Sequence, residues 1–260
     1  MLAIVFAIAF FASTIGAICG IGGGVIIKPV MDAVGAADVA TINFLSGCTV
    51  LSMTCYSVLK AKVSGDSKID PSIDTPLAIG AAIGGLLGRQ MFSAVAGFFG
   101  DANIAGAVQA GTLMVITVGT LVYTVNKDKI ATRSVTGALP CAAIGLVLGV
   151  SSSFLGIGGG PINLVVLFYF FTMSTKRAAQ SSLYIILFSQ AASTIAALLG
   201  GVSNIDVLLL VGMAACGILG GVVGRSVNKH IDEAAVDKLF CGLMVVIICI
   251  SGFNVFRYLG

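Results

Sequence analysis

Long apolar runs separated by short polar stretches recur along the whole chain. About 20 apolar residues are enough for a helix to span a bilayer, and the polar stretches between the runs are too short to form a soluble domain. The pattern predicts an all-α polytopic membrane protein with its partner lipid bilayer around it. The apolar runs are Leu2–Cys19, Thr41–Leu59, Pro76–Phe99, Asn103–Val125, Gly137–Leu155, Ala178–Gly200, Val207–Val227 and Leu239–Phe256.

Composition strengthens this prediction. The 260 residues are 58% hydrophobic and 10% charged, against about 25% charged in soluble domains. A net charge of +3, with no basic patch carrying interleaved aromatic residues, argues against nucleic acid as a partner. The seven cysteines fall inside apolar runs without a CxxC pair, and the one histidine, His230, lacks companions at metal-ligand spacing. We therefore expect no metal and no cofactor. The first run lacks a basic n-region and a clear cleavage site, so we interpret it as a span.

Two glycine motifs recur at one offset. Gly20-Ile-Gly-Gly-Gly24 returns as Gly156-Ile-Gly-Gly-Gly160, and Gly84-Gly-Leu-Leu-Gly-Arg89 returns as Gly220-Gly-Val-Val-Gly-Arg225, both 136 residues later. The chain is therefore predicted to consist of two repeats, residues 1–136 and 137–260. Paired interruptions of this kind are the best sequence indication of a transporter's binding site.

Loop charges indicate that the repeats are inverted. Lys60–Lys68 is basic, whereas its counterpart Gly200–Asp206 has no basic residue. The Asp32–Asp38 and Asp101 junctions are acidic, whereas their counterparts Lys176-Arg177 and Lys229–Lys238 are basic. Because basic residues accumulate on the cytoplasmic side, matching loops of opposite charge indicate that the two repeats have opposite orientations. Inversion is possible if each repeat consists of a helical hairpin that turns at its GIGGG, followed by three spans. This path places every basic loop on one side, whereas a simple eight-span path separates Lys176-Arg177 from Lys127–Arg133.

The glycine turns are candidate anion sites. Each precedes a helix, so free N–H groups at a helix N-terminus would face an anion, and inversion would bring both turns together near the midplane. The alternative is that the glycines only allow close helix packing, which we prefer for GGLLGR and GGVVGR. A dinucleotide-binding role fails because no βαβ unit surrounds the motif. The candidate backbone donors are Gly22, Gly23, Gly24, Gly158, Gly159 and Gly160.

Helix ends alone offer too little energy for an anion at mid-bilayer, so side chains must contribute. The polar candidates are Asn43, Gln180, Ser181, Ser182 and the deep cation Arg89. Each polar side chain could instead make an ordinary interhelical hydrogen bond. The acidic residues fall in or beside predicted loops, and we expect Lys28 and Arg225 to reach toward an interface.

These motifs resemble the TauE/SafE family of membrane permeases, the sulfite-exporter family. The resemblance covers essentially the whole chain, although Val165 stands where Pro29 would repeat. It implies a multi-pass transporter of the bacterial inner membrane whose partner is a small sulfur oxyanion or a sulfonate. The matching positions are Gly20, Gly22–Gly24, Pro29, Gly156, Gly158–Gly160 and Pro161.

The sequence thus favours a secondary transporter working by alternating access, and not an enzyme. Two alternatives stay open: an anion channel with the same site, and a membrane sulfur relay using thiols such as Cys19 and Cys48. A homo-oligomer is also compatible with the sequence, which leaves the particular anion, the direction and the coupling ion undetermined.

Overall fold

The protein is an all-helical bundle. The computed structural model describes residues 2–100, 102–200 and 206–259, and these contain helices and no strand. The Asp101 junction and most of the Gly200–Asp206 loop lie outside the described residues. The elements are α1 (Leu2–Cys19), α2 (Gly24–Val34), α3 (Val39–Val63), α4 (Pro71–Phe99), α5 (Ala102–Asn126), the 3-10 turn η1 (Lys127–Lys129), α6 (Ala138–Phe154), α7 (Pro161–Phe171), α8 (Thr175–Leu199), α9 (Val207–His230) and α10 (Glu233–Leu259).

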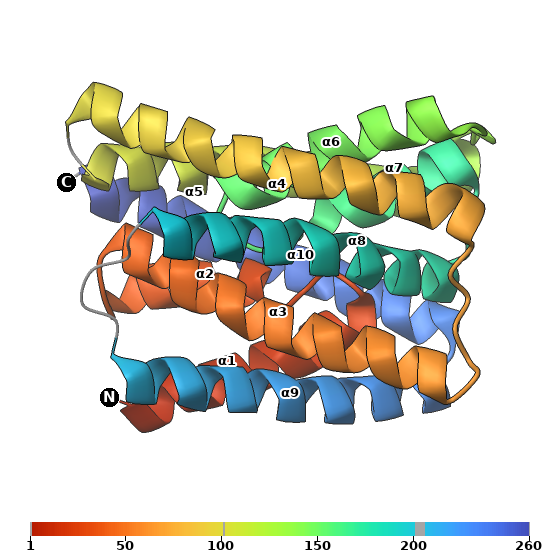
Figure 1. Cartoon of the computed structure of the whole chain (residues 1–260), viewed down its shortest axis with the longest axis horizontal. Helices are drawn as coiled ribbons and strands as arrows, with labels where there is room; N and C mark the ends of the chain where they lie inside the picture. Colours follow the sequence, from red (N-terminus) through yellow and green to blue (C-terminus); the bar gives the residue numbers. More distant parts are fainter. Residues whose placement is uncertain (1, 101, 201–205, 260) are drawn as a thin grey trace.

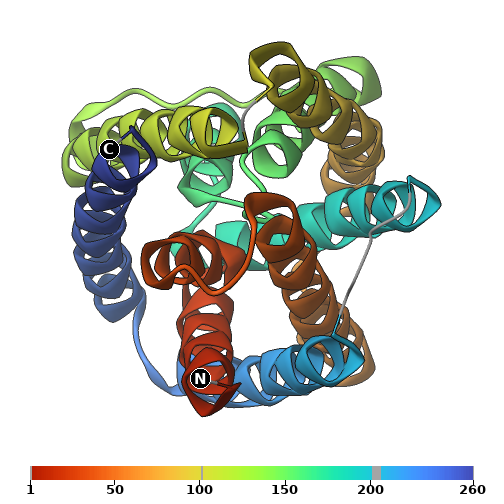
Figure 2. The ribbon, with the colours of Figure 1, turned by 90° about the vertical axis from the view of Figure 1, so that its left-hand side faces the viewer.

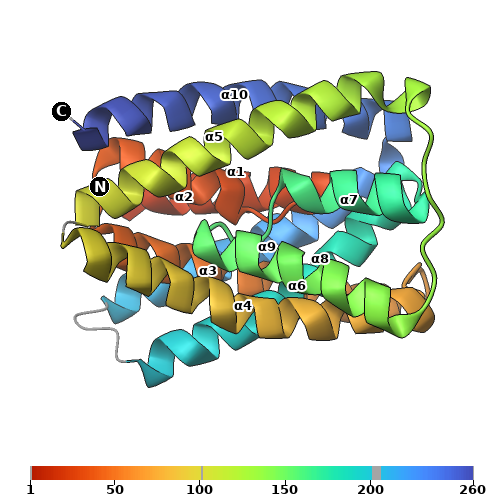
Figure 3. The same cartoon turned by 90° about the horizontal axis from the view of Figure 1, so that it is seen from above.

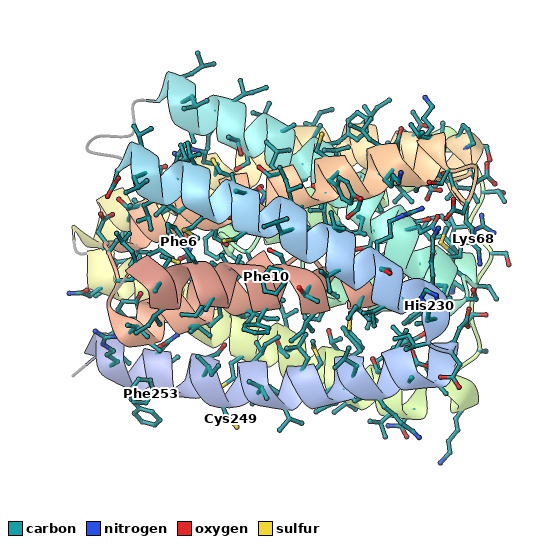
Figure 4. All side chains as sticks on the ribbon, turned by 90° about the horizontal axis from the view of Figure 1, so that it is seen from below. Phe6, Phe10, Lys68, His230, Cys249 and Phe253 are labelled. Atoms are coloured by element: carbon teal, nitrogen blue, oxygen red, sulfur yellow. The ribbon has the colours of Figure 1, made fainter. Side chains whose placement is uncertain are left out.

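Seven of the described helices are long and apolar enough to cross a membrane: α1, α3, α4, α5, α8, α9 and α10. Their outer faces are apolar, as on α10, where Cys249 and Phe253 project away from the bundle (Figure 4). A water-soluble protein rarely exposes so continuous an apolar surface. The predicted polytopic all-α membrane fold is therefore confirmed.

A helical hairpin opens each half of the chain. α1 and α2 are joined through residues 20–23, and α6 and α7 through residues 155–160. Figure 3 shows that α1 and α6 begin at opposite ends of the bundle and that α2 and α7 each turn back. Three long helices follow each hairpin. The run Gly137–Leu155 thus belongs to a hairpin helix of 17 residues, shorter than the seven candidate spans.

The GGLLGR and GGVVGR motifs pack each half against the hairpin of the other. A Cβ atom on Gly88 of α4 would lie 2.3 Å from the carbonyl oxygen of Val150 in α6. A Cβ atom on Gly224 of α9 would lie 2.3 Å from the carbonyl oxygen of Thr14 in α1. Val150 and Thr14 are themselves 136 residues apart, so the same contact occurs twice. These glycines serve close helix packing, as small residues do in membrane bundles.

The two ends of the bundle differ in charge. α1 begins and α10 ends at one end, here called the terminal end (Figures 1 and 2). The opposite end, here called the basic end, carries the 64–70 loop, the 127–137 segment and the start of α8. Lys68 and His230 both lie there (Figure 4). Arg177 at the start of α8 approaches Asp70 of the 64–70 loop at 3.6 Å, and the N–H of Arg133 donates to the carbonyl of Tyr169 in α7.

Candidate substrate site

The two glycine turns meet inside the bundle. Gly22 and Gly158 adopt φ values of 75° and 69°, a left-handed conformation that glycine adopts without steric cost. A Cβ atom on Gly24 would lie 2.0 Å from the carbonyl oxygen of Ile157, so the first turn lies directly against the second. No side chain caps the N-terminus of α2 or α7. The turns therefore present uncapped helix ends to one another's backbone.

No described cavity separates the turns. Gly22–Gly24 and Gly158–Gly160 are buried, and none of these six glycines lines either of the two cavities described below. Of the ten residues in the two GIGGG motifs, only Gly156 lines one of these cavities. The structure thus brings together the six predicted glycines but packs them against each other.

A polar cavity lies beside the second turn, in the half of the bundle near the terminal end. This cavity, here called the Arg89 cavity, has a volume of about 90 Å³ and lies between α3, α4, α8 and the end of α6. A Cβ atom on Gly156 would lie 2.1 Å from Oδ1 of Asn43, and one on Gly158 would lie 2.1 Å from Nε2 of Gln190. The side-chain amides of Asn43 and Gln190 therefore pack directly against the second glycine turn. The polar lining residues are Asn43, Arg89, Ser93, Ser153, Gln190, Ser193 and Thr194.

The charge of this cavity suits an anion. Arg89 is half-buried, and no described carboxylate lies within ion-pair distance of it. The other polar groups in the lining are amides and hydroxyls, which donate hydrogen bonds without adding negative charge. A guanidinium with such neighbours can bind a tetrahedral or pyramidal oxyanion through charge-assisted hydrogen bonds.

A second cavity corresponds to the first by the repeat offset. This cavity, here called the Arg225 cavity, has a volume of about 40 Å³ and shares no lining residue with the Arg89 cavity. Arg225 stands 136 residues after Arg89, and Ser57 stands 136 residues before Ser193. The correspondence also relates Ala17, Val58, Ala61, Ala179, Gln180, Leu183 and Asn228 to lining residues of the first cavity.

The 64–70 loop is fastened beside the Arg225 cavity. Nη2 of Arg225 lies 2.7 Å and Nζ of Lys229 2.5 Å from Oδ2 of Asp66. Gln180 accepts a hydrogen bond from the N–H of Lys68 at 2.7 Å and donates to the carbonyl of Asp66. The hydrogen bond from Lys229, followed by the charge of Arg225, lowers the pKa of the Asp66 carboxyl, so that it stays ionised at neutral pH.

The sequence profile of the sulfite exporter TauE/SafE family matches residues 5–250. The chain belongs to the TauE/SafE family. No curated protein and no solved structure matches it. Members of the family are transporters and not enzymes, so this TauE/SafE protein is a multi-pass membrane transporter of sulfite or related anions.

Within this TauE/SafE protein, the predicted side chains separate into two groups. Asn43 and Arg89 line the same cavity. Gln180 instead lines the Arg225 cavity and holds the 64–70 loop. Ser181 and Ser182 are buried and line neither of these cavities, and Ser182 lies 3.5 Å from Nδ2 of Asn163. These three residues are therefore not next to Arg89.

Sequence reasoning missed Gln190, Ser153 and Ser193 of the TauE/SafE protein. Gln190 carries the clearest signal, because a glutamine within a long apolar span is costly unless it is hydrogen-bonded or functional. It lies ten residues after Gln180 on α8, about 15 Å farther along the helix axis at 1.5 Å per residue. The serines have no comparable signal, since small hydroxyl residues are common in membrane helices.

Two expectations about charges are corrected. Lys28 does not reach toward an interface but is buried and paired with Asp32 at 2.7 Å, with both side chains 3% exposed. The acidic residues were expected in or beside loops, but Asp32 in α2 and Asp74 in the first turn of α4 belong to helices and are buried. The sequence obscured this because both residues stand near loops in the chain, whereas burial depends on how α2 and α4 pack.

Proposed function

We propose that this protein is a secondary transporter that carries a small sulfur-containing anion across the bacterial inner membrane by alternating access. Candidate substrates are sulfite, thiosulfate and organosulfonates such as sulfoacetate. One observation carries the proposal: the arginines of two cavities related by the repeat offset differ in their partners. Arg89 has no ion-pair partner within the described part of the chain, whereas Arg225 is bound to Asp66. Two half-paths, one available and one closed, are what alternating access requires.

The Arg89 cavity can offset the cost of holding an anion. A charge at the bilayer centre costs at least about 3 kcal/mol, and each charge-assisted hydrogen bond contributes about 1.5–3 kcal/mol. Arg89 together with Asn43 and Gln190 offers several such bonds. In this proposal the glycine turns form the barrier between the two cavities, and their backbone N–H groups reach the anion only when the turns separate.

The loop charges support an orientation. If the basic end faces the cytoplasm, the Arg89 cavity lies on the outer side and the fastened 64–70 loop closes the inner side. The two inverted repeats, residues 1–136 and 137–260, would then exchange these states during transport. The repeated contacts of Gly88 and Gly224 support that symmetry.

The alternatives receive less support. An anion channel needs a continuous path, whereas the two cavities share no lining residue. A thiol relay needs reactive cysteines at the site, whereas Cys19 and Cys48 line neither of these cavities. The carrier therefore fits the geometry best.

The decisive experiment measures sulfite uptake into proteoliposomes by wild type and Arg89→Gln. We expect saturable uptake that falls at least about tenfold in the variant, since one charge-assisted hydrogen bond contributes about that factor. Arg133→Gln, which removes an exposed cation at the basic end, should leave uptake unchanged. Uptake by Arg89→Gln equal to wild type would remove this cavity from the transport path.

A second measurement tests Gln190, which the sequence analysis did not select and which the structure places in the Arg89 cavity. Gln190→Met keeps the size of the side chain but removes its amide. The sulfite concentration needed to stabilise the purified protein should therefore rise about tenfold. Gln90→Met, on the exposed face of α4, is the matched control. Thiosulfate, sulfoacetate, sulfate and chloride complete the panel. Stabilisation by chloride and sulfate alone would exclude the proposed substrate class.

A further inference from the structure

The carboxylate of Asp66 binds Arg225, the cation that lines the Arg225 cavity. Its Oδ2 atom is shared between Nη2 of Arg225 at 2.7 Å and Nζ of Lys229 at 2.5 Å. The Arg225 side chain is 14% exposed, and that of Asp66 is 36% exposed. Arg225 therefore already binds an oxyanion, which is the Asp66 carboxylate of the same chain.

The corresponding place in the other half has no such carboxylate. Arg89 corresponds to Arg225, and by the same offset the sequence places Val202 where Asp66 stands. Val202 lies outside the described residues, but its side chain cannot form an ion pair. Ser93 of the Arg89 cavity corresponds to Lys229. At these two pairs of corresponding positions, the Arg225 side has two cations and the Arg89 side has one, and only the Arg225 side has the Asp66 carboxylate.

We infer that the Arg225 cavity is a second anion site of the transport cycle, in which the Asp66 carboxylate takes the place of the substrate. The inference rests on the proposed function of the Arg89 cavity, since it assigns the same ligand class to the related cavity. Arg225 and Lys229 together suit a doubly charged oxyanion such as the sulfite dianion. Asn228 and Ser57 line the same cavity and add polar groups.

Attachment to the chain explains why the carboxylate holds this place. A group on a short linker competes at an effective concentration in the millimolar range, and Asp66 follows the end of α3 by only three residues. Gln180 strengthens the effect by bonding to the backbone at Asp66 and Lys68. Free anion therefore reaches Arg225 only when the loop leaves, which links substrate binding to the opening of this half.

The test counts sulfite sites by isothermal titration of the purified protein in detergent. Wild type should bind one sulfite, dependent on Arg89. Asp66→Asn should add a second site, which Arg225→Gln in the same background removes and Lys229→Gln weakens about tenfold. Asp70→Asn, in the same loop but facing Arg177, and Lys238→Gln are the controls, and neither should change the number of sites.

The outcomes separate this inference from the proposed function. A single Arg89-dependent site in Asp66→Asn and also in Asp66→Ala would overturn the inference while keeping the proposed function. A site that appears in Asp66→Asn but does not depend on Arg225 would overturn it as well. Wild-type binding that persists in Arg89→Gln would instead contradict the proposed function. Asp66→Ala provides the second variant if Asp66→Asn folds poorly.

Discussion

Nη2 of Arg225 lies 2.7 Å from Oδ2 of Asp66, whereas Arg89, one repeat earlier, has no ion-pair partner among the described residues. Two arginines at matching places in matching cavities thus have different surroundings. The difference originates in the 64–70 loop, because Asp66 has no acidic counterpart 136 residues later. In the proposed transport cycle, this contact marks the half that is closed.

Removing the Asp66 charge should open the Arg225 cavity. In a background without native cysteines, a cysteine at the buried position Ser57 should react with a water-soluble maleimide about two to five times faster in Asp66→Asn, as expected for loss of a partly exposed ion pair. Asp70→Asn should leave the rate unchanged. Equal rates in Asp66→Asn and the parent protein would show that the contact does not hold the cavity closed.

The closed state should not respond to pH between about 5 and 8. The hydrogen bond from Lys229 and the charge of Arg225 lower the pKa of Asp66 below its ordinary value of about 3.9. Because the pKa is lowered, the contribution of the ion pair is fully present above about pH 4 and is lost only as the pH falls through the lowered pKa. The labelling rate at Ser57→Cys, measured across this range and corrected for maleimide reactivity, should stay constant. A rise near pH 6 would assign the closure to another group.

Gly88 and Gly224, which contact the hairpin helix of the other half of the chain, should not tolerate a larger side chain. Gly88→Ala and Gly224→Ala each place a Cβ atom 2.3 Å from a carbonyl oxygen of the facing helix, and such overpacking costs about 1–3 kcal/mol. Both variants should unfold at lower temperature in detergent. Gly97→Ala and Gly119→Ala meet nothing within 4 Å and should be neutral or slightly stabilising, because alanine favours a helix. Similar unfolding temperatures in all four variants would contradict the packing role.

The two ends of the bundle should lie on opposite sides of the membrane. Cysteines at Thr132 and Ser174, both exposed at the basic end, should be labelled from the cytoplasmic side. Cysteines at Ala37 and Val207, at the terminal end, should be labelled from the outside. Labelling of Thr132→Cys and Ser174→Cys from different sides would refute the inverted arrangement and the assignment of the Arg89 cavity to the outer side.

Two features of the sequence, the apolar runs and the duplicated glycine motif, predicted most of the fold. The lengths of the apolar runs predicted the seven long helices, because a bilayer requires about 20 apolar residues per crossing. The duplicated GIGGG predicted where each hairpin turns, because consecutive glycines interrupt a helix. The exact helix bounds differ, as in α4, which begins at Pro71 and not at Pro76. Hydropathy does not detect the polar first turn of a membrane helix.

The candidate site was predicted only in part. Asn43 and Arg89 were chosen as polar residues near a glycine motif, and they do share a cavity. Gln180 was chosen for the same reason, yet it holds a loop about 15 Å along α8 from Gln190. Chain position locates a residue along its own helix but does not identify the neighbouring helix that it faces.

The sequence by itself determined the membrane class, the two related halves and the glycine turns, because hydrophobicity, repeat offset and backbone preference are local properties of the chain. Only the tertiary structure decided that Asn43, Arg89 and Gln190 share one cavity, that Lys28 is buried with Asp32, and that Asp66 reaches Arg225 across 159 positions. These contacts depend on how helices pack against each other, and such packing joins residues whose separation along the chain carries no information about their distance in space.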